Sequence, residues 1–428
     1  MVVKVSLLVI LNIIFFAGGA FAQSWKQLST TNNPSARRNA SAVYDPFQHR
    51  MIVFGGVDAT GNKNDIWSLS LSTLAWSLLT PSTGNLPDAR FSHNAMIDTG
   101  FNRMLIWSGQ GSGLYNDVWA FNFLDSAWIQ LWANGNVSGA PLTRYGTGAI
   151  YDVSKNRLVN YAGFTSSGRF QDTWYFETDS IVWREQTKSI TPGLRCLHSV
   201  CFAPELRKMV MYGGQRSGPL DDIWALDVDS FDWTDLTPTT KPDARYFSSV
   251  VYAGNGKVFM FGGQTASGPS GELWQFSLSD NSWTQISQGS VKPTPRQGHA
   301  AIYVPSSNKM VIFSGTDGSL FNDSWEFSLS TTSFREFRNQ PIRFSLDQNF
   351  PNPFNPTTRI GYNLSEPGLV SLKVFDLLGR EVASLLNTVQ NIGHYETVFN
   401  AALLPAGVYL YRLQQGNFVE TRRMILVK

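Results

Sequence analysis

The sequence predicts an all-β protein in which a six-bladed β-propeller is followed by a small β-sandwich. The main observation is a pattern of about 50 residues that occurs six times between residues 38 and 334. Each copy holds four short strand-like segments separated by Gly, Pro, Asp and Asn, and a propeller blade consists of four strands. After residue 340 the repeats end, and a segment rich in Pro and Asn opens a second group of strand-like stretches.

Each repeat carries the same residue types in the same order. It begins with an arginine at the expected first strand: Arg38, Arg90, Arg144, Arg195, Arg245 and Arg296. The second strand ends in an aromatic residue, a small residue and a glycine, as at residues 54–56. The third strand begins with an acidic residue two before a tryptophan: Asp65/Trp67, Asp117/Trp119, Asp172/Trp174, Asp222/Trp224, Glu272/Trp274 and Asp323/Trp325. Nine residues later the fourth strand has Trp76, Trp128, Trp183, Trp233, Trp283 or Phe334.

The alternation within the third strand predicts sheet rather than helix. Trp67, Leu69 and Leu71 fall on one face of an extended chain, and four other repeats show the same spacing of apolar residues. Twelve of the 14 tryptophans occupy repeat positions, all except Trp107 and Trp132. We therefore expect nearly all of them to pack between blades, and not to form a platform for sugars.

The sequence also indicates how the ring closes. Residues 24–28 around Trp25 look like a spare fourth strand, whereas the fourth strand of the last repeat has Phe334 in place of tryptophan. We expect the N-terminal strand to complete the last blade, and the segment around Phe334 to be displaced or doubled.

These motifs resemble those of the kelch family over roughly residues 38–334. Ser108, Ala162 and Ser314 replace the first glycine of their pairs, and Glu272 replaces aspartate. The resemblance implies a kelch-type propeller with one repeat per blade, and it leaves the function open.

The N-terminus is predicted to be a secretory signal peptide of residues 1–22. Lys4 precedes an apolar stretch at residues 5–16, and a small-x-small cleavage site at residues 20–22 precedes Gln23. The apolar stretch is short for a membrane span, and we expect no transmembrane segment elsewhere. The expected domains are therefore the signal peptide, a propeller at residues 23–340 and a β-sandwich at residues 341–428.

The tail resembles the C-terminal sorting domain (type A) of bacterial type IX secretion. The resemblance lies in residues 349–357, 374–382, 404–409 and 424–428, and its sorting-signal residues are Asn349, Pro351, Pro353, Asn355, Pro356, Gly379, Pro405, Gly407 and Lys428. It implies export across the outer membrane by the type IX machinery and removal of the domain on arrival. An ordinary adhesion module with an Ig-like sandwich fold is the alternative.

Two sets of side chains are candidate sites in the propeller. The six arginines could form a funnel for an acidic peptide or an anionic sugar, or each could pair with the acidic residue of its own repeat. His93, His198 and His299 lie three residues after their arginines, where the intervening repeats have Ser41, Thr147 and Ser248. They could bind an axial metal, although local packing is the simpler interpretation. Cys196 and Cys201 are expected to be separate thiols.

The function indicated is binding of a protein or glycan at the cell surface or outside. The variable loops between second and third strands, residues 57–64, 110–116, 164–171, 215–221, 264–271 and 316–322, are where binding is normally grafted. The alternatives are a carbohydrate-active enzyme of oxidase, lyase or epimerase type at the channel mouth, and a structural surface component. With 34 Lys and Arg against 32 Asp and Glu, the chain has no basic field for nucleic acid. We expect a monomer without a cofactor.

Overall fold

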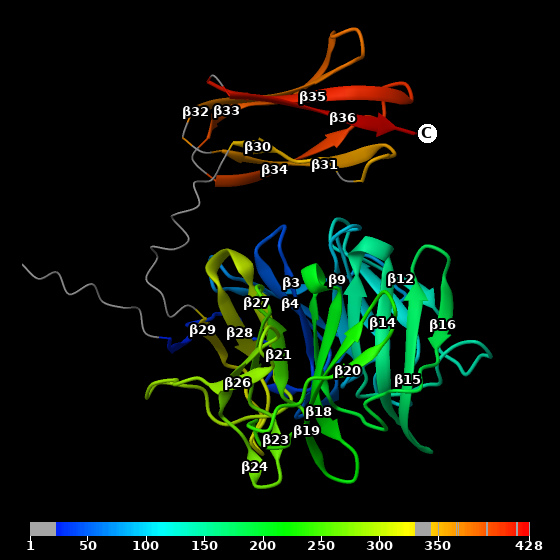
Figure 1. The fold of residues 1–428 in the computed structure, drawn as a ribbon, viewed down its shortest axis with the longest axis vertical. Coiled ribbons are helices and arrows are strands. Elements are labelled where there is room, and N and C mark those ends of the chain that lie inside the picture. The colour runs from blue at the N-terminus through cyan, green and yellow to red at the C-terminus, as the bar shows by residue number, and fades with distance from the viewer. Residues whose placement is uncertain are drawn as a thin grey trace, which may run out of the picture. The chain divides into compact units, whose positions relative to one another are not determined.

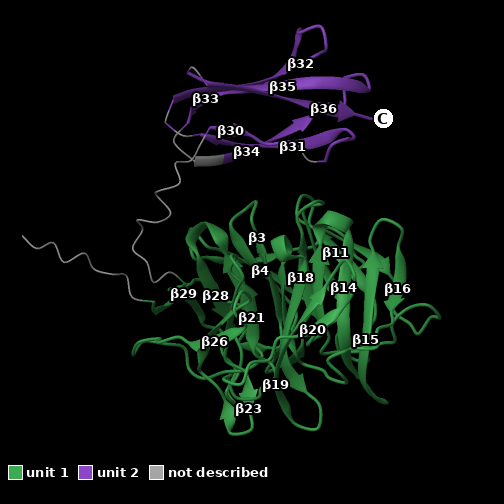
Figure 2. Ribbon diagram, viewed as in Figure 1, with its two compact units in different colours: residues 1–331 green, residues 332–428 purple. Residues whose placement is uncertain are grey.

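The computed structural model describes residues 23–329, 344–349, 351–364, 366, 368–390, 393–416 and 418–427. The chain divides into two compact units, residues 1–331 and 332–428, which Figure 2 shows in different colours. The signal peptide, Phe334, Lys428 and the expected boundary at residues 340 and 341 all lie outside the described residues. No helix in these ranges is long and apolar enough to cross a membrane.

Unit 1 contains six four-stranded antiparallel sheets, which Figure 1 shows side by side. The first strand of each sheet lies on the inside, where it contacts the first strands of the two neighbouring sheets. The first three blades are β3 (Ser41–Asp45), β4 (Arg50–Phe54), β7 (Ile66–Ser70) and β8 (Trp76–Leu79); β9 (Asn94–Asp98), β10 (Arg103–Trp107), β11 (Val118–Asn122) and β12 (Ala127–Trp132); and β13 (Gly148–Asp152), β14 (Arg157–Thr165), β15 (Gly168–Glu177) and β16 (Val182–Gln186). The predicted propeller of six blades is confirmed.

The other three blades follow the same plan. They are β17 (Ser199–Ala203), β18 (Lys208–Gln215), β19 (Pro219–Asp227) and β20 (Trp233–Asp235); β21 (Ser249–Tyr252), β22 (Lys257–Phe261), β25 (Leu273–Ser277) and β26 (Ser282–Gln285); and β27 (Ala300–Val304), β28 (Lys309–Phe313), β29 (Ser324–Ser328) and β1 (Trp25–Gln27). In the last of these, β1 pairs with β29, so the N-terminal strand completes blade 6 as predicted.

The core of the propeller lies between the blades and is built from two of the sequence motifs. The fourth-strand tryptophan of each blade packs on an aromatic residue in the second strand of the preceding blade. The six ring pairs, with centroids 4.5 to 5.2 Å apart, are Trp76–Phe313, Trp128–Phe54, Trp183–Trp107, Trp233–Tyr161, Trp283–Tyr212 and Trp25–Phe261. The six fourth-strand tryptophans are thus inter-blade packing groups, as expected. Trp76 and Trp25 make the same contact on either side of the closing blade.

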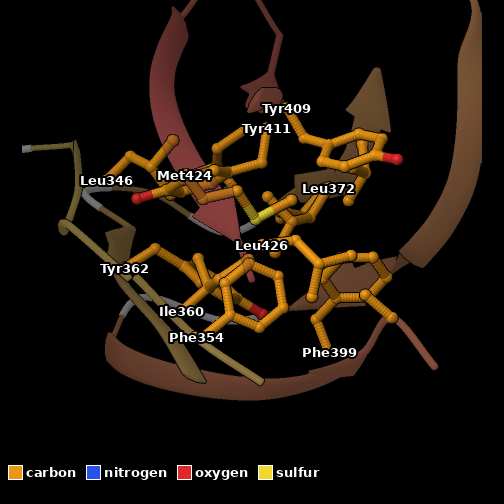
Figure 3. Packing of buried hydrophobic residues seen from close by; sticks show 14 of the residues in the cluster. Leu346, Phe354, Ile360, Tyr362, Leu372, Phe399, Tyr409, Tyr411, Met424 and Leu426 are labelled. Carbon is orange, nitrogen blue, oxygen red and sulfur yellow. The ribbon is translucent and has the colours of Figure 1, made fainter. Parts of the chain in front are cut away.

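Unit 2 is a two-sheet β-sandwich. One sheet has the order β30 (Ser345–Leu346), β31 (Thr357–Leu364) and β34 (Gly393–Asn400); the other has β33 (Glu381–Gln390), β32 (Gly368–Phe375), β35 (Gly407–Gln415) and β36 (Phe418–Leu426). Alternate residues of the two sheets face inward and form the core in Figure 3, where Phe354, Phe399 and Tyr411 are among the labelled side chains.

Candidate functional site

The repeat arginines lie just before the first strands of their blades, where they are buried and bound to other groups of the protein. Each is at most 2% exposed and pairs with the acidic residue of its own repeat at 2.5 to 2.7 Å. In blade 2, both terminal nitrogens of Arg90 donate to Asp117, and Nη1 also donates to the carbonyl of Ser108. Asp117 in turn accepts a hydrogen bond from Trp119 Nε1 at 2.8 Å. These guanidinium groups hold strands together and are not free to meet a ligand.

One member of the predicted set is wrong: the equivalent arginine in blade 1 is Arg37, not Arg38. Arg37 is 1% exposed and binds Asp65 and the carbonyl of Gly55, whereas Arg38 is exposed. The arginine lies 18 residues before its carbonyl partner in five blades and 17 in blade 5. That spacing distinguishes the two neighbouring arginines in the sequence.

The electrostatics of these pairs follow from burial and charge. Burial alone would raise the pKa of Asp222, but the hydrogen bonds and charge of Arg195 outweigh it and hold the pKa below its ordinary value. Asp323 beside Arg296 and Glu272 beside Arg245 show the same direction for the same reasons. Glu272 replaces the usual aspartate with a longer side chain, and Ser270 Oγ then accepts the hydrogen bond from Arg245 Nη1 at 3.0 Å.

The first strands of the six blades surround a central cavity of about 220 Å³. Six of the residues that line this cavity lie two positions after the repeat arginines. They are here called the ring residues: Asn39, Ser92, Gly146, Leu197, Phe247 and Gly298. The backbone N–H of each ring residue donates to the carbonyl of the ring residue in the preceding blade at 2.7 to 3.1 Å, and Asn39 donates to Gly298. All six have φ between 49° and 63°. A closed circle of backbone hydrogen bonds therefore surrounds the channel.

Each of the three predicted histidines directly follows a ring residue and lines this cavity, and its imidazole packs between two blades. His93, His198 and His299 stand edge-on to Phe54, Tyr161 and Phe261 of the preceding blade. Nε2 of His93 lies 2.5 Å from Ser41 Oγ, and Nε2 of His299 lies 2.7 Å from Ser249 Oγ. Gly148 takes the place of that serine opposite His198, and a Cβ there would lie 2.5 Å from His198 Nε2.

These contacts match the local-packing interpretation. Among the described residues, no group of three His, Cys, Asp or Glu side chains is placed to hold a metal ion. Burial first, and then the charge of the repeat arginine, lowers the pKa of each histidine to about 3. The equivalent of His93 in blade 1 is Ala40, because it follows Arg37 by three residues; the sequence-based choice of Ser41 is wrong by one position.

The chemistry available in the channel is limited to hydroxyl, amide, imidazole and apolar groups. Among the described residues that line the cavity there is no Asp, Glu, Lys, Arg or Tyr. The described residues of the wall thus offer no carboxylate pair for general acid and base catalysis.

The blades differ most at the entrance formed by the loops between second and third strands. We call this entrance the loop mouth. Its twelve residues form six cross-paired couples, one per blade: Arg38/Val57, Phe91/Gln110, Tyr145/Phe164, Cys196/Gln215, Tyr246/Gln264 and Gln297/Thr316. In blades 1 and 5 the loops add the short strands β2 (Arg37–Arg38), β5 (Val57–Asp58), β6 (Gly61–Asn62), β23 (Gln264–Thr265) and β24 (Gly268–Pro269). Because this position varies while the arginines do not, it is the candidate binding site.

Two further features complete the picture of unit 1. Asp45, Asp98 and Asp152 are fully buried at the ends of first strands and pair with Arg50, Arg103 and Arg157. The sequence analysis missed these pairs, although an Asp and an Arg five residues apart recur in blades 1 to 3. Cys196 and Cys201 are separate, buried thiols, as expected.

In unit 2 the strand pairing gathers the predicted sorting residues toward one end of the sandwich. Thr357 pairs with Asn400, Phe375 with Leu410, and Gly407 with Leu426. The segments that hold Pro351, Pro353, Asn355, Pro356, Gly379, Pro405 and Gly407 therefore meet at the same end, although they span 57 positions of the sequence. Asn349 is 1% exposed, and its side-chain amide donates to the Pro351 carbonyl and to Thr358 Oγ1. It anchors the proline-rich segment to the sheet.

Comparisons with known proteins agree with this division. The family model described as "KLHDC2/KLHL20/DRC7 Kelch-repeats domain" matches residues 16–189 and 186–345, and that described as "Secretion system C-terminal sorting domain" matches residues 348–428.

Individual relatives match part of the chain only. A "Dynein alpha chain, flagellar outer arm" of Chlamydomonas reinhardtii is 27% identical over 205 residues, 45% of this chain and 4% of that protein. A "Leucine-zipper-like transcriptional regulator 1 homolog" of Drosophila melanogaster is 25% identical over 41% of this chain and 18% of that protein. A "Host cell factor homolog hcf-1" of Caenorhabditis elegans is 27% identical over 39% and 24%. The chain thus matches a quarter or less of the length of these relatives. Because the repeat model covers most of the chain and each repeat forms one blade, the protein belongs to the kelch-repeat family and carries a type IX secretion sorting domain at its C-terminal end.

Proposed function

We propose that this protein is exported by the type IX route and that its propeller binds a partner outside the cell. The observation that carries the proposal is the joining of two units in one chain: a kelch propeller and a secretion sorting domain. The partner is a protein or a glycan, and the loop mouth is the surface that receives it.

The export half of the proposal is tested by the mass of the mature protein. A signal peptide at residues 1–22 and removal of the sorting domain predict a species that starts at Gln23 and ends near residue 340. The measurement is intact mass spectrometry of the protein recovered from the medium and from the cell surface of its native host. A product that still ends at Lys428 would show that the sorting domain is retained and belongs to the mature protein.

The binding half is tested by capture of the partner. The full chain, with a photo-crosslinking residue at Gln110 or Gln264 in the loop mouth, is added to the native host's extracellular material. We expect crosslinked species from these two positions and none when the same residue stands at Leu124, an exposed position between the third and fourth strands of blade 2. Equal labelling from all three positions would contradict a role for the loop mouth.

A further inference from the structure

The charges of the propeller arginines single out the loop mouth. The described part of the propeller holds 14 arginines, and 11 of them form an ion pair with a carboxylate. Within the same residues, three have no such partner: Arg38, Arg169 and Arg216. Arg38 belongs to the loop mouth, Arg169 lies near the start of β15 in blade 3, and Arg216 follows Gln215 of blade 4. Within residues 23–329, the guanidinium groups that lack a carboxylate partner therefore all lie at one entrance.

Arg169 has the most unusual surroundings of the three. It is partly buried, its guanidinium carbon lies 5.2 Å from the ring centroid of Phe164, and Nη2 donates one long hydrogen bond of 3.4 Å to Gln215 Oε1. Its Nε is buried and has no acceptor in the described structure. A docking carboxylate can reach only the terminal nitrogens, and the one hydrogen bond to Gln215 leaves N–H donors on them beside an aromatic face, an arrangement that suits a planar carboxylate.

The acids of the same loops do not supply that carboxylate. Asp58 is bound by Ser35, Thr60 and Lys63, and those hydrogen bonds outweigh burial and hold its pKa well below the ordinary value. Asp221 pairs with Lys241 at 3.2 Å. Asp317 accepts the backbone N–H of Ser319 within its own turn. The cations of the loop mouth are thus left for a ligand from outside.

Aromatic side chains lie between the unpaired arginines. Phe91 and Tyr145 have ring centroids 6.5 Å apart, and Tyr145 stands edge-on to Phe164 with ring centroids 5.5 Å apart. The Phe164 ring in turn contacts the guanidinium group of Arg169. On the opposite side, Arg38 lines a hollow of about 270 Å³ between blades 1 and 6. Tyr, Phe and Arg are the residue types enriched where proteins bind other proteins.

We propose that the loop mouth docks an acidic segment of another protein. Carboxylates of that segment pair with Arg169, Arg216 and Arg38, and its apolar atoms pack on Phe91, Tyr145 and Phe164. Charge complementarity identifies the occupant, because the entrance offers unpaired cations and engaged acids. This inference rests on the proposed binding function and adds the chemistry of the partner.

The test is a binding titration of the full chain with three fluorescent probes. They are a peptide of alternating Glu and Gly, the same peptide with Gln in place of Glu, and an oligogalacturonate. We expect the Glu peptide to bind more tightly than the other two, and binding to weaken with added salt. Arg169→Gln should weaken Glu peptide binding about tenfold or more, because charge-assisted hydrogen bonds are lost. Arg184→Gln is the matched control, since it removes an exposed arginine from the outer strand of the same blade.

Four results would overturn the inference: no binding of the Glu peptide, equal binding of the Gln peptide, preference for the oligogalacturonate, or an equal loss in Arg184→Gln. The proposed function fails separately. If crosslinking still captures a partner at the loop mouth and Arg169→Gln does not reduce that capture, binding stands and the acidic partner is wrong.

Discussion

Asp117 is the counter-ion of a guanidinium that has no access to water. Arg90 is 0% exposed, and apart from Asp117 its partners are two backbone carbonyls. Asp117→Asn should destabilise the propeller by about 3–5 kcal/mol, because it leaves a buried charge unpaired. The measurement is urea unfolding followed by tryptophan fluorescence, which reports the propeller alone because all 14 tryptophans lie between residues 25 and 325.

Asp65→Asn is the matched comparison for this prediction. The Asp65 side chain is 26% exposed, and Arg37 keeps a hydrogen bond to Ser35 Oγ at 2.9 Å when its carboxylate is lost. The expected loss is therefore smaller, about 1–3 kcal/mol. Equal losses in the two variants would show that exposure does not set the cost of breaking these pairs.

The channel histidines make the stability of the propeller depend on pH. Their pKa is about 3 in the folded protein and near 6.5 when unfolded, so the unfolded chain binds more protons below pH 6.5. Stability is complete above that value and falls as pH decreases toward 3. Each histidine should cost on the order of 2 kcal/mol between pH 7 and pH 5.

His198→Phe tests this dependence, since Gly148 leaves His198 without a side-chain partner to lose. Melting temperatures at pH 7 and pH 5 should differ less in this variant than in the native protein. His49→Gln, outside the channel, should leave the difference unchanged. If His198→Phe keeps the full difference, protonation of this imidazole does not contribute.

At the scale of strands, the N-terminal strand β1 holds the ring closed. Trp25 is 3% exposed, packs on Phe261 and Phe327 with centroids 4.8 and 5.1 Å away, and donates from Nε1 to Gln288. Trp25→Ala should cost about 3–5 kcal/mol in unfolding free energy. Lys26→Ala, on the outward face of the same strand, should change it little. Similar values for the two variants would mean that β1 is not part of the cooperative unit.

Sequence periodicity predicted the blades and the closing strand, because each motif recurs and its position in one repeat can be tested against the other repeats. The prediction failed in the first repeat, where two adjacent arginines, Arg37 and Arg38, could both match the motif. Periodicity could not predict the circle of ring residues. Leu197 and Phe247 adopt left-handed backbone there, which their side chains disfavour, and only the neighbouring blades supply the hydrogen bonds that hold it.

The sequence located the variable loops but did not show which of their side chains matter, and the reason is physical. The arginines that occur in every repeat are the more obvious candidates in the sequence, but in the folded protein they are buried and stabilise their own blade. Arg169 and Arg216 follow no repeat rule, and what distinguishes them is that neither forms an ion pair with a carboxylate of the described residues, which depends on how loops of different blades meet. Unpaired charge is a property of the folded chain and not of a motif.

At the scale of the whole molecule, each unit has its own core, so damage to the sorting domain should not reach the propeller. Tyr411 is fully buried in unit 2, and its hydroxyl accepts the N–H of Asn349 and donates to the carbonyl of Asp347, both at 2.7 Å. Tyr411→Ala removes the ring and both hydrogen bonds that anchor the proline-rich segment. It should destabilise unit 2 by about 3–5 kcal/mol and leave the tryptophan-reported unfolding of the propeller unchanged.

If export requires the folded end of the sandwich where the sorting residues gather, the same variant should accumulate in the periplasm of the native host. Immunoblots of periplasm and medium measure this distribution. Arg412→Ala, an exposed neighbour on β35, should be exported normally, as should the propeller variant Arg169→Gln. Normal export of Tyr411→Ala would mean that the machinery recognises a linear segment of the tail. The convergence of the sorting residues would then serve only the stability of the sandwich.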